Sequence, residues 1–71
     1  MQITYLLLIK FRLNDYDIEE TFDFKSAALK RYNELLDNRE RQIIDYMDLT
    51  KIIEVEGKEP VHQELMSFKD S

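Results

Sequence analysis

The chain has 71 residues, of which 35% are charged and 44% hydrophobic, and its formal net charge is −5. This length suffices for a single domain over residues 1–71, and its periodic apolar runs predict a packed core. The absence of cysteine excludes disulfides, thiolate metal clusters and cysteine nucleophiles, and it favours a reducing, cytoplasmic location. The negative net charge disfavours direct binding to nucleic acid.

The first apolar run, residues 3–9, is too short to cross a bilayer and follows no basic segment of the kind that precedes a signal-peptide core. No membrane association is therefore expected. Its β-branched and aromatic residues predict a strand over residues 2–13. Alternate residues of a strand point to opposite faces of the sheet, and Leu6 and Leu8 make the second face of this strand apolar as well as the first. We therefore expect the strand to be central in its sheet.

Asn14 and Asp15 favour a turn, after which residues 16–25 alternate with a period of two. Apolar side chains share one face with Glu20, and acidic side chains dominate the other face. This alternation is typical of an edge strand that has one packed face and one solvated face.

A helix is predicted over residues 27–37, with Ser26 as its N-cap and Asn38 at its end. The apolar face of this helix consists of Ala28, Leu29, Tyr32, Leu35 and Leu36. The spacing indicates an amphipathic helix that packs on one face of the sheet.

The segment that follows allows two interpretations. Arg39 and Arg41 belong either to a charged connector or to a short second helix, and the pattern leaves open whether residues 39–47 are helix or strand. A third strand is predicted over residues 49–56, ended by Gly57.

Pro60 fits the first turn of a short C-terminal helix, in which Val61, Leu65 and Phe68 would share a face. Together the elements predict an α+β fold with a small antiparallel sheet, in β-β-α-β order, and one main amphipathic helix. Right-handed crossover connections favour the strand order 2-1-3.

One helix covers one face of such a sheet, so the second face needs a cover from the C-terminal segment or from another chain. Leu6 and Leu8 are therefore candidates for self-association, and a homodimer is expected because a core of this size is small.

The sequence gives little support for a catalytic site or a metal-binding site. Glu59 and His62 have the Glu-x-x-His spacing of carboxylate metal sites, but two candidate ligands are too few for a defined geometry. His62 is predicted to be a surface histidine, with no metal or other cofactor. Because no nucleophile has a recognisable base and the paired carboxylates are exposed, we expect a protein that is not an enzyme.

The acidic face of the second strand is the most unusual surface feature, and it predicts binding to a protein with a basic surface, including one built for nucleic acid. Tyrosines near it would provide anchors with a large contact area. The candidate partner-binding residues are Asp15, Tyr16, Asp17, Glu19, Asp23, Arg39, Arg41 and Tyr46.

The helix pattern Ala28, Tyr32, Leu35 and Leu36 after a hairpin is similar to that of many short accessory proteins of phages and mobile elements in low-GC bacteria. The resemblance implies a small inhibitor or adaptor that binds and blocks a host or defence protein. Two alternatives remain open. One is a structural homo-oligomer, and the other is a sponge for an anionic small ligand, such as a signalling nucleotide, held in a dimer crevice lined by Lys and Arg.

Overall fold

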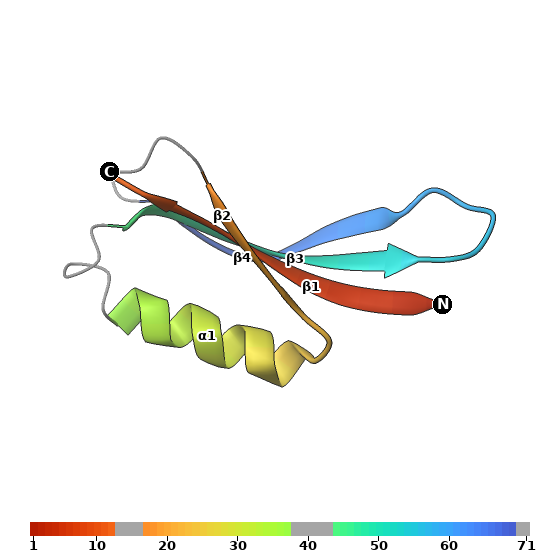
Figure 1. The fold of residues 1–71 in the computed structure, drawn as a ribbon, viewed down its shortest axis with the longest axis horizontal. Coiled ribbons are helices and arrows are strands. Elements are labelled where there is room, and N and C mark those ends of the chain that lie inside the picture. The colour runs from red at the N-terminus through yellow and green to blue at the C-terminus, as the bar shows by residue number, and fades with distance from the viewer. Residues whose placement is uncertain (13–16, 38–43, 70–71) are drawn as a thin grey trace.

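The computed structural model describes residues 1–12, 17–37 and 44–69. Figure 1 shows that the described elements form one antiparallel sheet with a helix on one side of it. In chain order the elements are β1 (Gln2–Phe11), β2 (Ile18–Phe22), α1 (Lys25–Asp37), β3 (Ile44–Glu54) and β4 (Val61–Lys69). The strands lie in the order β2-β1-β3-β4.

The predicted α+β class, with a small antiparallel sheet and a helix, is confirmed. The predicted β-β-α-β order was incomplete, because the described chain continues into a fourth strand. β1 pairs antiparallel with both β2 and β3, so β2 and β3 run parallel to each other. α1 connects these two parallel strands and contacts β1, β2 and β3.

The predicted C-terminal helix is wrong, because this segment forms β4 and pairs with β3. Leu49 of β3 pairs with Met66 of β4. The next β3 residue pairs with Glu64, so Leu65 is an extra residue that forms a β-bulge. The bulge interrupts the period of two, and the remaining spacing of apolar residues resembles one face of a helix.

Other boundaries differ from the prediction by a few residues. β3 begins at Ile44, so 44–47 are strand, while 38–43 lie outside the described residues. α1 begins at Lys25, and the amide of Ala28 donates to the carbonyl of Phe24 at 3.2 Å. Phe24 therefore occupies the N-cap position, and Ser26 lies within the first turn.

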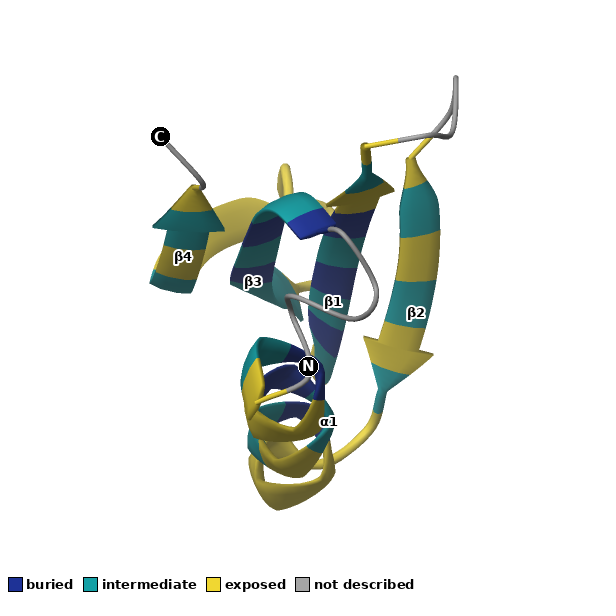
Figure 2. Cartoon of the chain, turned by 90° about the vertical axis from the view of Figure 1, so that its left-hand side faces the viewer, coloured by how far each residue is buried: buried dark blue, intermediate teal, exposed yellow. Residues whose placement is uncertain are grey.

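The hydrophobic core lies between α1 and the face of the sheet that the helix covers (Figure 2). Its buried residues are Tyr5, Leu7, Ile9, Ala28, Tyr32, Leu35, Ile44, Met47 and Leu49. Phe22 of β2 and Phe68 of β4 pack at its margins. The central position of β1 is confirmed, since β1 lies between β2 and β3.

α1 covers only one half of the sheet (Figure 1). The other half consists of residues 1–4 and 50–64, which we call the arm, and it extends past the helix. The turn of the arm is closed by a bond from the Lys58 amide to the Val55 carbonyl, at 3.0 Å. The chain measures 42 × 24 × 17 Å, and its radius of gyration is 13.0 Å, whereas a compact domain of this length has about 11 Å.

Candidate functional site

The face of the sheet opposite α1, which we call the open face, has no described element packed over it (Figure 1). Residues that pair directly across antiparallel strands point to the same face. Leu8 therefore lies between Glu19 of β2 and Asp48 of β3. Leu6 lies between threonines of the same two strands, and both leucines are half-buried.

The open face is acidic. Its charged residues, by register, are Lys10, Glu19, Asp48, Glu54, Glu64 and Lys69. Acidic side chains thus outnumber basic ones around the central leucines. Leu6 and Leu8 lie among polar and charged side chains, with Glu19 on the edge strand β2 and Asp48 on the interior strand β3.

A hollow of about 460 Å³ indents the open face at the end where β1 terminates. It is lined by Lys10, Asp17, Asp45, Tyr46 and Lys69. Tyr46 pairs with both lysines, one on each neighbouring strand. Arg12 donates a hydrogen bond from its Nε atom to the Oδ1 atom of Asp45, at 3.1 Å.

The Tyr46 hydroxyl is held in its protonated form. Its pKa is raised above the ordinary value, first by burial and then by the negative charges of Asp48, Asp17 and Glu64. A neutral phenol donates one hydrogen bond and offers its ring as a contact surface. Tyr46 therefore offers a hydrogen-bond donor and an apolar ring among acidic side chains.

Glu20 is an acidic residue on the face of β2 that is otherwise apolar, and it forms an ion pair with a residue of α1. Arg31 of α1 donates from Nε to Oε1 at 2.9 Å and from Nη2 to Oε2 at 3.1 Å. This hydrogen bond is the main reason that the pKa of Arg31 is raised. The forked pair ties α1 to the edge strand, and it occupies both oxygens of Glu20.

Three of the predicted partner-binding residues are near one another at one end of the open face. Asp17 and Tyr46 both line the hollow, and Glu19 follows two residues after Asp17 on the exposed edge of β2. Asp23 was expected in the same row but lies in the bend after β2. The strand ends at Phe22 because the chain turns there into α1, so Asp23 is separate from the acidic row.

The remaining predicted candidates, Asp15, Tyr16, Arg39 and Arg41, lie outside the described residues. The sequence prediction missed the contribution of Asp48, which faces Leu8 from β3. Its signal was present in the alternation of β3, but that strand was expected to begin only at residue 49.

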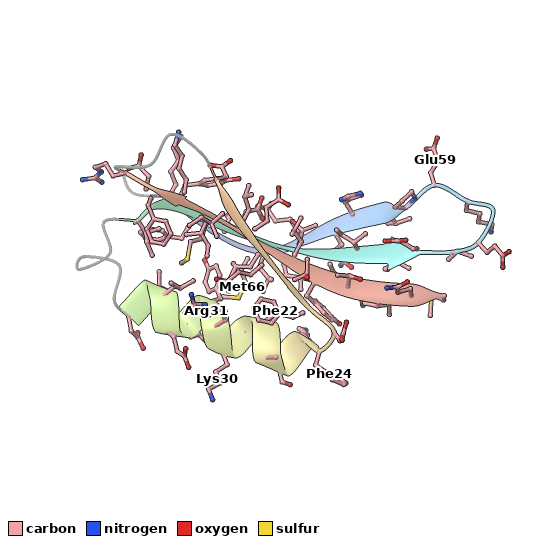
Figure 3. All side chains as sticks on the ribbon, in the orientation of Figure 1. Phe22, Phe24, Lys30, Arg31, Glu59 and Met66 are labelled. Carbon is pink, nitrogen blue, oxygen red and sulfur yellow. The ribbon has the colours of Figure 1, made fainter. Side chains whose placement is uncertain are left out.

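His62 is exposed on β4 and pairs with Ile52, while Glu59 lies in the turn before that strand and points away from the sheet (Figure 3). Among the described residues, no group of three or more His, Cys, Asp or Glu side chains is arranged to hold a metal ion. In the same parts of the chain, no helix is long and apolar enough to cross a membrane.

Comparisons with protein-family models, with curated proteins and with solved structures found no match. What the open face can bind therefore has to be inferred from its own geometry and charge.

Proposed function

We propose that this protein is a non-enzymatic binding module whose open face docks a partner protein with a basic surface. The observation that carries the proposal is the cross-strand row of Glu19, Leu8 and Asp48. It sets an apolar side chain between two carboxylates on a face that no described element covers. An apolar side chain gives affinity when water is excluded, and the charged groups beside it select the partner and speed encounter.

The chemistry of this face defines what the partner should present. Leu6 and Leu8 offer contact to an apolar side chain, and the carboxylates of Glu19 and Asp48 accept hydrogen bonds from Lys or Arg. Tyr46 adds a donor and a ring at the margin, beside Asp17. The complementary surface is therefore a basic ridge or groove with an apolar residue at its centre.

The biological role that follows is that of a small inhibitor or adaptor. A protein that occupies a basic groove would compete with any other acidic ligand of that groove, nucleic acid included. Inhibition is also what the similarity to short phage and mobile-element accessory proteins implies.

The two alternative functions receive less support from the same face. A homo-oligomer built by stacking two open faces over Leu6 and Leu8 would bring the carboxylates of both copies together, and like charges at an interface are unfavourable. An anion sponge would use Lys10 and Lys69. In the hollow, these two lysines share the space with Asp17 and Asp45, which cancels the attraction for an anion.

Charge reversal on the open face tests the proposal. Affinity capture from cells of the native host, with quantitative mass spectrometry, would identify the partner, and calorimetry on the purified pair would give Kd. Glu19→Lys should raise Kd by about tenfold or more, because it sets a cation against the basic surface. Asp37→Lys makes the same change of charge at the exposed end of α1, and Kd should stay within about twofold.

Equal loss of affinity in the two variants would show that only the net charge matters, and an unchanged Kd in Glu19→Lys would rule out the open face. Circular dichroism of each variant checks that the fold is retained.

A further inference from the structure

The arm has a second uncovered surface, on the side of the sheet where α1 lies. Ile3 of β1 pairs with Ile53 of β3, which pairs in turn with Val61 of β4. These three residues form a continuous apolar row across three strands, which we call the arm row. Ile3 and Ile53 are half-buried, while Val61 is 57% exposed.

Phe24 adds to this surface. Its side chain is 72% exposed, and Figure 3 shows it at the end of α1 that is nearer to the arm. Scattered apolar side chains are common on protein surfaces, but a row across three strands beside an exposed phenylalanine is the pattern of an interaction site.

The dimensions of the fold suit a second arm in this position. A helix is about 10 Å across, and stacked sheets lie about 10 Å apart. A second arm laid on the arm row would therefore occupy the same layer as α1, directly beyond the start of the helix. The half of the sheet that α1 leaves bare would then have a cover of the same thickness.

Charges at the two ends of this surface are complementary. The tip of the arm carries Glu54, Glu56 and Glu59 against Lys58. The first turn of α1 begins with Lys25 and contains no acidic residue, while Asp23 lies in the bend two residues before it. Because the start of a helix favours negative charge, the acidic tip of one copy fits the start of α1 in another.

We propose that two copies of this chain form a dimer through their arms, about a two-fold axis. The arm row of each copy packs against the arm row of the other, and each acidic tip lies beside Lys25 and Phe24 of its partner. The interface is isologous, so it closes at two copies. The open face is on the opposite side of the sheet, and it stays available for the partner protein of the proposed function.

Adjacent residues of β4 provide a matched test, because they point to opposite faces of the arm. Val61→Glu places a charge in the arm row, and His62→Glu places the same charge on the open face. Sedimentation equilibrium and light scattering should give a dimer for the unaltered chain. Val61→Glu should raise the dimer Kd by at least about tenfold, and His62→Glu should leave it within about twofold.

A single cross-link tests the geometry, since the chain has no cysteine of its own. Chains carrying Glu56→Cys, mixed with chains carrying Lys25→Cys, should form a disulfide between unlike chains faster than between like chains. A mixture of His62→Cys with Lys25→Cys is the control, and it should form this bond slowly.

A monomer across the micromolar to millimolar range would overturn the proposal. A dimer that His62→Glu dissociates as strongly as Val61→Glu would also overturn it, as would one that dissociates with Leu6→Lys alone, because the interface would then be the open face. A dimer through the open face would also contradict the proposed function, because it would occupy the surface assigned to the partner protein. The other outcomes leave the capture experiment with Glu19→Lys unaffected, so failure of the arm dimer alone can be told apart from failure of the proposed function.

Discussion

The pair formed by Glu20 and Arg31 shows how a single residue that breaks a pattern acquires its partner. Glu20 lies on the apolar parity of β2, opposite Leu7, where an unpaired carboxylate would lose hydration. Arg31 reaches it from α1 with two hydrogen bonds. The sequence marks Glu20 as an exception, but it does not identify the cation, because the partner depends on where the helix is placed over the sheet.

Removing the cation should therefore destabilise the fold. Arg31→Met leaves the half-buried carboxylate of Glu20 without its donors, and the free energy of unfolding should fall by about 1–2 kcal/mol. The double variant Glu20→Leu with Arg31→Met removes both charges and should recover most of that loss. Urea unfolding of the unaltered chain, of the two single variants Arg31→Met and Glu20→Leu, and of the double variant measures the coupling between the two residues. Strictly additive losses in the free energy of unfolding would contradict it.

Tyr46 and Tyr32 make stability depend on alkaline pH. Burial is the first cause of the raised pKa in both, and the charge of Asp48 adds to it. An unfolded tyrosine titrates near pH ~10. Below that pH both states are protonated and the stabilisation is complete. Above it the unfolded state loses its protons first, so stability falls as the pH rises through the folded pKa.

Tyr46→Phe removes one of these groups, so the decline in unfolding free energy above pH ~10 should be shallower than in the unaltered chain. Urea unfolding at a series of alkaline pH values measures the slope. The comparison at pH 7 is the control for packing effects, and an unchanged alkaline slope would count against this role for Tyr46.

The turn between β3 and β4 depends on one backbone conformation. Gly57 has φ of 79°, and a Cβ added there would meet no atom within 4 Å. The cost of a substitution is therefore conformational and not steric. Gly57→Ala should destabilise the protein by about 1 kcal/mol, which lowers Tm by about 4–8 °C in a domain of this size.

Asparagine tolerates the left-handed conformation better than alanine. Gly57→Asn should accordingly lower Tm by less than Gly57→Ala in the same thermal unfolding experiment. A larger loss with Asn, or no loss with Ala, would show that the turn does not require this conformation.

Helices and strands whose apolar residues recur with an uninterrupted period were predictable from the sequence. β1 was expected at the centre because both its parities are apolar, and α1 was expected from its apolar face, of which Ala28, Tyr32 and Leu35 are buried. β4 was missed because the bulge at Leu65 shifts its parity. Such a bulge is a property of two paired strands, so one strand read alone does not reveal it.

At the scale of the whole molecule, the sequence indicated a sheet with a helix on one face only. It did not indicate how far along that face the helix extends. Leu6 and Leu8 indicated which face is uncovered, and the acidic residues at alternate positions of β2 indicated that one edge of this face is negatively charged. The position of Asp48 beside Leu8, on the interior strand β3, required the register between β1 and β3. The arm could not be foreseen, because it depends on where α1 lies along the sheet.

Two uncovered apolar surfaces on opposite faces of one sheet allow two independent associations. The open face, around Leu8, is proposed for a basic partner protein, and the arm row, around Val61, for a second copy of the chain. Together they would make the dimer a bivalent binder, which raises the effective affinity for a partner with two accessible sites.

Methyl NMR on the isotopically labelled chain provides the most direct measurement, because each surface carries its own methyl groups. Titration with the purified partner protein should shift the signals of Leu6, Leu8 and Ile52 on the open face. The signals of Ile53 and Val61 should instead respond to dilution of the chain alone. If the partner protein shifts the arm row or α1 and leaves Leu6 and Leu8 unchanged, the open face is not the binding surface.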